Sequence, residues 1–328
     1  MFTARFSKSI GASAIALIAG LALASVAAAE TRVTLKSASS TSSYYVMMVQ
    51  LGEMMKAQSG GKIQATVEES QGSVQNVKES ARRPGNFLFT TPPSLLVSAR
   101  EGKKPFEGET GYDRVRALFV VPFVTIHFAV QQDSGITDVM QLEGKKFIAG
   151  GKGTFCEGRT RRIFELLGLE GKVETVDVEL SAASNAMRND RVTGFATCSS
   201  HPTPQLVELA TTNPLTVLSF TDAQREAILK ADPMSGPLTI AAGTYKGQDK
   251  PVNTVGVPVG AFTTTDMDDE TAYFITRNFW QQREALAKDN PWWAGVSPEM
   301  VNQLGTRLHP GALKYYKEAG VTLDASLM

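Results

Sequence analysis

The most reactive side chains in this sequence are its two cysteines and a histidine close to one of them. Cys198 lies three residues before His201, and an imidazole beside a thiol is the arrangement that activates a cysteine nucleophile. No third residue that would orient the imidazole can be named from the sequence. The alternative is a disulfide bond between Cys198 and Cys156, which would remove the thiol from catalytic use. Nucleophilic catalysis is therefore the less favoured interpretation.

A run of hydroxyl side chains offers a different chemistry, the binding of an anionic group. Ser39 to Ser43 are five consecutive serine or threonine residues, and they precede a segment with helical spacing. Hydroxyls and free backbone N–H groups at the start of a helix together make a seat for an anion. Simple N-capping is the alternative, but one cap needs only one hydroxyl, so the run favours ligand binding. A second stretch, 71–76, has capping as its default interpretation.

A glycine-rich stretch at 150–156 resembles a phosphate-binding loop only superficially. It lacks the G-x-x-x-x-G-K-[ST] pattern, so nucleotide binding is weakly supported. Arg159 follows on the next expected helix, and its guanidinium fork would suit a carboxylate. The alternative is that Arg159 is a solvated surface residue, as most helix arginines are.

The elements that must position these residues form two similar units. In the first unit the apolar residues from Tyr44 to Met55 recur at i, i+3, i+4 and i+7, which predicts one face of a helix. The order β-α-β-α-β predicts a parallel sheet with right-handed crossovers. We expect strands at 32–38, 63–68 and 86–90 with helices at 44–59 and 72–83, and then strands at 146–150, 173–178 and 194–197 with helices at 157–167 and 182–189.

Two apolar segments are expected to connect these units. Residues 116–130 form an apolar run with a central proline, which suits a strand that leaves one lobe and enters the other. Residues 254–262 are the second candidate crossover. We therefore predict a hinge-linked, two-lobe α/β protein in which each lobe has a mostly parallel, doubly wound sheet. The expected boundaries are 30–123 and 256–328 for lobe 1 and 124–255 for lobe 2.

A doubly wound sheet of order 2-1-3 binds ligands beyond the carboxyl ends of its first and third strands. This rule selects 39–43 and 90–94 in lobe 1, and 150–156 and 197–201 in lobe 2. It also places Cys156 and Cys198 in neighbouring loops. We predict a disulfide bond between them, closing a loop of about 42 residues. Two buried free thiols are the alternative.

The composition argues against two further classes of protein, those that bind nucleic acid and those that bind zinc. The 33 basic residues balance 33 acidic ones, so no global field would attract nucleic acid, and no nucleic-acid partner is expected. Three histidines and two cysteines leave little material for a zinc site with four ligands. We expect neither a metal nor a cofactor.

Residues 1–29 have the pattern of a signal peptide. Arg5 and Lys8 precede an apolar stretch from Ile10 to Ala24, and Ala27 to Ala29 supply small residues for cleavage. A membrane anchor is the alternative, but a spanning helix needs roughly 20 apolar residues. We expect cleavage after Ala29 and a periplasmic location, which is an oxidising compartment.

Several stretches, in this order along the chain, resemble the TAXI family of solute-binding proteins. These proteins are the extracytoplasmic receptors of TRAP transporters, secondary carriers driven by an ion gradient. The resemblance covers about residues 32–320. The matching stretches are Tyr44-Tyr45 behind the hydroxyl run, 72–76, 132–136, 243–248, 254–258, and 308–312 with Tyr315-Tyr316.

The loops expected to touch the ligand match the family in part. Ser39 and Ser40 match a Ser and a Thr of its first loop, and 72–76 matches Gly-Ser-Val-Glu-Asn with Gln75 in place of Glu. The sequence departs from the family at 91–93, where Thr-Pro-Pro replaces Gln-Ser-Asp. It departs again in lobe 2, where Glu157 occupies the position of an arginine. A larger, more apolar or less acidic ligand is therefore an alternative to the family's usual one.

The resemblance implies a periplasmic binding protein fold, type II-like, without enzymatic activity. It implies a monomer that captures a small organic anion (a dicarboxylate, an oxo acid or an acidic amino acid) and delivers it to the permease subunits of a TRAP transporter. The receptor of an ABC importer and a secreted Cys-dependent hydrolase are the alternative functions. The candidate ligand-binding residues are Ser39, Ser40, Tyr44, Ser73, Asn76, Thr91, Thr154, Phe155, Arg159 and His201.

Overall fold

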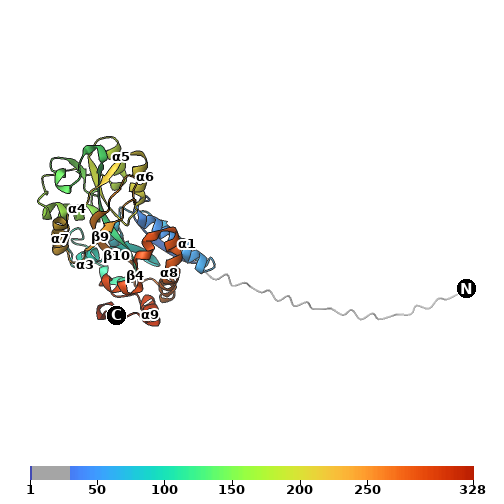
Figure 1. Cartoon of the computed structure of the whole chain (residues 1–328). Helices are drawn as coiled ribbons and strands as arrows, with labels where there is room; N and C mark the ends of the chain where they lie inside the picture. The colour runs from blue at the N-terminus through green and yellow to red at the C-terminus, as the bar shows by residue number, and fades with distance from the viewer. Residues whose placement is uncertain (2–29) are drawn as a thin grey trace.

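The computed structural model of the protein describes Met1 and residues 30–328, and the remainder of the predicted signal peptide lies outside the described residues (Figure 1). No helix in the described part of the chain is long and apolar enough to cross a membrane. Figure 1 shows two parts: the middle of the chain, green to yellow, forms one, and the blue N-terminal and red C-terminal segments form the other. The predicted two-lobe α/β arrangement is present, but the strands of the described residues form one continuous ten-stranded mixed sheet and not a separate sheet in each lobe.

The first three strands form a parallel sheet in the predicted order 2-1-3. β1 (Thr31–Lys36) lies between β2 (Ile63–Glu68) and β3 (Phe87–Thr91) and is parallel to both. The helices of this unit are α1 (Ser43–Gln58), α2 (Ser73–Ser80) and α3 (Pro93–Arg100). α1 buries the predicted apolar face against the sheet because its residues at helical spacing all lie on one side. The buried residues of that face include Tyr44, Met47, Met48, Leu51, Met54 and Met55.

The second unit repeats this topology. β5 (Lys146–Ile148) lies between β6 (Glu174–Thr175) and β7 (Gly194–Ser199) and is parallel to both, so the order is again 2-1-3. β6 is shorter than the predicted strand because Val178 turns to accept a hydrogen bond from Lys152 N at 3.0 Å. The other elements of this unit are α4 (Phe155–Leu166), α5 (Ala183–Arg188), α6 (Pro204–Thr212), β8 (Leu215–Val217), α7 (Asp222–Ala231) and β9 (Gly236–Ile240).

Two long strands join the parallel units, as predicted. β4 (Val115–Gln131) and β10 (Val252–Thr264) are antiparallel to each other. β10 also pairs with β3, and β4 also pairs with β7, so each long strand extends one of the two units. The register shifts between Val257 and Val259, on either side of Pro258. A proline cannot donate to the ladder, which explains its position at the irregularity.

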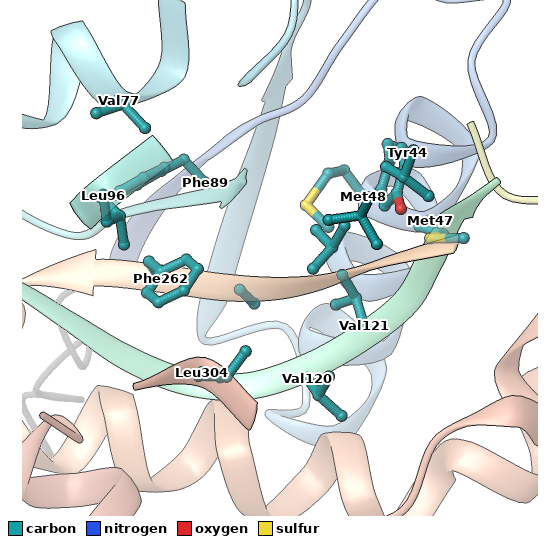
Figure 2. Packing of buried hydrophobic residues seen from close by; sticks show 14 of the residues in the cluster. Tyr44, Met47, Met48, Val77, Phe89, Leu96, Val120, Val121, Phe262 and Leu304 are labelled. Carbon is teal, nitrogen blue, oxygen red and sulfur yellow. The ribbon is translucent and has the colours of Figure 1, made fainter. Parts of the chain in front are cut away.

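The C-terminal segment returns to the first unit and completes its core. α8 (Asp269–Asp289) packs on β4 through Phe279, whose ring stacks on Phe119 with centroids 4.1 Å apart. Figure 2 shows Val120 and Val121 of β4 together with buried side chains of other elements, among them Met48 and Phe262. The remaining helices are α9 (Pro310–Glu318) and short 3-10 helices at Tyr112–Arg114, Gln132–Ser134, Val139–Leu142, Leu180–Ala182, Pro291–Gly295, Pro298–Leu304 and Ala325–Leu327.

Candidate ligand-binding cleft

A cleft of about 420 Å³ lies between the two units of the sheet, on one face of the long strands. Val124 of β4 and Val259 of β10 form its floor, and hydroxyl and amide side chains dominate its walls. Its lining residues outside the floor are Ser37 to Ser42, Tyr44, Glu69 to Ser73, Gln75 and Thr90 from the first unit, and Thr154 to Cys156, Leu180, Ser181, Thr197 to Ser199 and Gln205 from the second.

The hydroxyl run before α1 divides into two groups. Ser42 caps α1, and its Oγ also lies 3.0 Å from Ser199 Oγ across the cleft. Ser43 is fully buried, and its Oγ lies 2.5 Å from Ser199 Oγ and donates to the Ser200 carbonyl at 2.7 Å. Ser39, Ser40 and Thr41 line the cleft without a hydrogen bond from their hydroxyls to the described residues of the second unit, and Ser39 Oγ lies 3.1 Å from Thr41 Oγ1. The run is therefore both a contact between the two units and a polar wall.

The start of α2 forms the adjacent part of the wall. Ser73 lines the cleft, and Asn76 lies behind it, buried. The Asn76 amide donates to the carbonyls of Ser37 at 2.7 Å and Thr90 at 3.1 Å. Asn76 thus ties the loop after β1 to the end of β3 and does not itself line the cleft. Within the described residues, the N–H groups of Ser73 and Val74 have no hydrogen-bond partner, as expected in the first turn of a helix.

The second unit contributes the start of α4. Thr154 lines the cleft and caps α4: its Oγ1 accepts from Glu157 N at 3.0 Å and lies 2.8 Å from the Gly150 carbonyl. A Cβ at Gly150 would lie 2.6 Å from Cys156 Cβ, and the φ of Gly150 is +113°. The glycine-rich loop is therefore explained by the close approach of the strand end to the first turn of α4, and a phosphate site is not needed to explain it.

Cys156 and Cys198 form the predicted disulfide bond, with their Cα atoms 5.5 Å apart. Both cysteines line the cleft, so the bridge fixes the first turn of α4 to β7 at the cleft wall. The chain has no other cysteine. In this oxidised form, neither sulfur is available as a nucleophile, which removes the basis of the Cys-dependent hydrolase interpretation.

Besides Asn76, three further predicted residues lie outside the lining of this cleft. Arg159 forms an ion pair with Asp232, and its Nη2 donates to Ser235 Oγ at 2.5 Å, so its fork is already occupied. Thr91 is fully buried, and its hydroxyl donates to the Pro92 carbonyl. His201 borders a second cavity of about 470 Å³.

The second cavity lies on the opposite face of β4. Phe123 and Thr125 line it, whereas Val124 between them lines the first cleft, because successive strand residues point to opposite faces. His201 Nδ1 lies 2.7 Å from Thr125 Oγ1 on that face. Its side chain therefore cannot reach a ligand in the first cleft without a rearrangement.

Burial and charge set the electrostatics of the first cleft. Burial raises the pKa of the Tyr44 hydroxyl well above its usual range, and the hydroxyl donates to the Pro122 carbonyl at 2.7 Å. Tyr44 is thus a neutral link between α1 and β4. Glu69 is the sole charged residue among those lining the cleft in the described chain. No group of three or more His, Cys, Asp or Glu residues within the described chain is arranged to hold a metal ion.

The profile of the NMT1-like family matches residues 35–320 of the sequence. The chain belongs to this family. Three solved structures have folds similar to that of this NMT1-like protein. The periplasmic binding protein BugD is 16% identical with a TM-score of 0.55, and the match covers 90% of this chain and 99% of that one.

The other two structures come from Rhodopseudomonas palustris. MatC (Rpa3494) with bound malate is 11% identical with a TM-score of 0.57, covering 88% of this chain and 97% of its own. Rpa4515 with adipate is 15% identical with a TM-score of 0.58, covering 90% and 99%. These similarities show that the NMT1-like chain has the two-lobe, type II-like fold of periplasmic binding proteins.

Sequence reasoning missed several residues of the cleft in this NMT1-like protein. Glu69 follows β2 directly, and the rule for doubly wound sheets directs attention to the first and third strands only. Ser37 was expected inside the strand 32–38, but it directly follows β1, and its buried Oγ has no hydrogen-bond partner within the described residues. Ser199 was expected only as part of the stretch 197–201, and its contacts with Ser42 and Ser43 depend on the tertiary fold.

Proposed function

We propose that this protein is the extracytoplasmic solute-binding protein of a TRAP transporter and belongs to the TAXI group of such receptors. It captures a small organic ligand with an anionic group between its lobes and delivers it to the membrane permease. Export with cleavage after Ala29, a periplasmic location and a monomeric state are part of this proposal. So are the lobe boundaries, 30–123 with 256–328 and 124–255.

The observation that carries the proposal is a polar cleft between two lobes of a periplasmic binding protein fold, with helix starts from both lobes at its walls. Ser73 of α2 and Phe155 of α4 begin these helices on opposite sides. Backbone N–H groups in the first turn of a helix carry partial positive charge and lack intrahelical partners. They can hold an anionic group without a basic side chain.

The binding groups on this proposal are hydroxyls and backbone amides. Ser39, Ser40 and Ser73 supply hydroxyls from lobe 1, and Phe155 supplies an apolar side chain from lobe 2. The hydroxyls of Tyr44 and Thr154 are already engaged, so these two residues shape the cleft. The absence of a lysine or arginine from the described lining favours a ligand whose anionic group is small and singly charged.

A thermal-shift screen of the mature chain against organic acids and amino acids tests ligand binding. A ligand at 100 times its Kd should stabilise the folded state by about 2.7 kcal/mol. If no solute of the screen raises the melting temperature, binding of a small organic ligand is contradicted.

Transport measurements test the TRAP assignment. Uptake by cells that express this chain with the permease encoded beside its gene should follow the ion gradient and persist when ATP hydrolysis is blocked. Uptake that requires ATP hydrolysis would instead assign the chain to an ABC importer.

A further inference from the structure

The charge of the cleft lining indicates which second group the ligand carries in addition to its anionic group. Among the residues that line the cleft in the described chain, Glu69 is the only one that carries a formal charge. Its side chain is exposed to the cleft, and its Oε1 accepts a hydrogen bond from Ser40 N at 2.6 Å. Oε2 has no hydrogen-bond partner within the described residues. One carboxylate oxygen therefore remains available to a ligand.

No basic residue of the described chain forms an ion pair with Glu69. Lys36 is buried, and its Nζ pairs with Glu68 at 3.5 Å and Glu79 at 3.1 Å. Arg159 on the other lobe is held by Asp232. Closure of the lobes on a ligand would displace water around Glu69, and a carboxylate that loses water without gaining a cation is strongly disfavoured. The ligand has to supply the positive charge.

A second polar side chain at the same wall, that of Ser37, also lacks a hydrogen-bond partner within the described residues. Ser37 is 1% exposed and lines the cleft, and its Oγ has no hydrogen-bond partner within the described residues. Buried hydroxyls are normally paired, so an unpaired one on a residue of the cleft wall points to a partner that arrives with the ligand. Ser37 directly follows β1, Glu69 directly follows β2, and these two strands are paired.

We propose that the ligand is zwitterionic, with a protonated amine that binds Glu69 beside an anionic group held at the helix starts. Glu69 is then the residue that distinguishes amino acids from the corresponding carboxylic acids. Ser37 contributes a neutral hydroxyl to the same subsite. This inference rests on the proposed function and narrows the ligand class of the same cleft.

Matched ligand pairs test the inference directly. Isothermal titration calorimetry on the oxidised mature chain would compare glutamate with glutarate, glutamine with glutaramate, and leucine with 4-methylpentanoate. The two members of each pair differ in the amine alone. For at least one pair, we expect the amine-bearing member to bind about 10- to 100-fold more tightly, as for a hydrogen bond between charged groups.

Glu69→Gln is the informative variant because a glutamine oxygen can still accept the Ser40 N–H bond while the charge is lost. We expect it to remove the preference for the amine and to leave the affinity for the deaminated acid within about threefold. Glu107→Gln is the matched control, since Glu107 is exposed and lies outside the cleft lining. It should leave both affinities unchanged.

Three outcomes would overturn the inference. They are equal affinity within every pair, an equal loss of both affinities in Glu69→Gln, and no binding of any amine in the panel. The second outcome would assign Glu69 to holding the Ser40 loop. If an amine-free solute raises the melting temperature in the thermal-shift screen, none of these three outcomes contradicts the proposed function. Failure of the amine inference can therefore be distinguished from failure of the proposed solute-binding function.

Discussion

At the scale of single residues, the same chemical group serves two purposes in the cleft. The hydroxyls of Ser43 and Ser199 are buried and bond to each other across the two units. The hydroxyls of Ser39 and Ser73 lie on the cleft walls, where a ligand can reach them. Burial, and not residue type, separates structural hydroxyls from those proposed to bind the ligand, since the Ser39 hydroxyl also has a partner, Thr41 Oγ1 at 3.1 Å.

Removing the two wall hydroxyls tests their role. The double variant Ser39→Ala and Ser73→Ala should weaken binding of the best ligand from the thermal-shift screen, because each lost hydrogen bond to a charged group costs about 1.5–3 kcal/mol. Calorimetric Kd values measure the effect. Ser98→Ala on α3 is the control, since its hydroxyl bonds only to the Ser94 carbonyl within the helix. Binding like that of the unmodified chain would place the site elsewhere.

A buried histidine on β4 is held in one tautomer by its neighbours. His127 Nδ1 lies 3.1 Å from the Thr125 carbonyl and 3.3 Å from the Thr197 carbonyl, and carbonyls only accept, so Nδ1 carries the hydrogen. Nε2 then accepts from the Tyr245 hydroxyl at 2.9 Å, whose oxygen accepts from Thr203 N at 3.1 Å. This chain of bonds requires a neutral imidazole.

Acid should therefore destabilise the fold through His127. Burial, with a smaller effect of His201, lowers the pKa of His127 to about 3 from an ordinary 6.5. The unfolded chain takes up the proton first, so stability is full above pH 6.5 and falls by up to about 1.4 kcal/mol per pH unit below it.

Urea denaturation between pH 5 and 6.5 measures this effect. This pH window excludes the protonation of carboxyl groups such as Glu68 and Glu109, which take up protons only at lower pH. A hydrogen bond from Arg83 lowers the pKa of Glu68, and one from Lys78 lowers the pKa of Glu109. His127→Gln should be less stable at pH 7 but show a flatter pH dependence in this window. A slope as steep as that of the unmodified chain would contradict the assignment.

At the scale of elements, the helices and strands that depend on the spacing of nearby residues were predicted from the sequence. The apolar spacing from Tyr44 to Met55 predicted α1, and the order of elements predicted the 2-1-3 order of both parallel units, although these units are the two ends of one sheet. Arg159 was different, because its partner Asp232 follows α7, far along the chain, and no periodicity reveals that ion pair. Glu69 was missed for a topological reason: the loop after the second strand of this lobe also reaches the cleft.

The disulfide bond joins two elements, and its removal tests how much it stabilises them. It closes a loop with a sequence separation of 42 residues. The chain-entropy model gives about 3–4 kcal/mol for a loop of that size. The double variant Cys156→Ser and Cys198→Ser should lose about that much stability in urea denaturation. Non-reduced peptide mapping of periplasmically expressed protein should show the bridge, and two thiols that are alkylated without reductant would refute it.

At the scale of the whole molecule, the long strands determine how the lobes can move. β4 and β10 pair with each other and extend into both units, so they are the covalent links across the cleft floor. The register irregularity at Pro258 interrupts their ladder close to Val124 and Val259, which form that floor. Bending at this irregularity would bring the walls together while each lobe keeps its own core.

Closure around a ligand is the resulting prediction for the whole molecule. Small-angle scattering of the mature chain should show a smaller radius of gyration at saturating ligand, because hinge bending moves two compact lobes towards each other. The Ser39→Ala and Ser73→Ala double variant is the control at the same solute concentration, since it should bind too weakly to close. Closure should also shield Glu69 from water, which links this motion to the choice of an amine-bearing ligand. A scattering profile that does not change at a concentration where calorimetry shows full occupancy would mean that the ligand enters a cleft of fixed width.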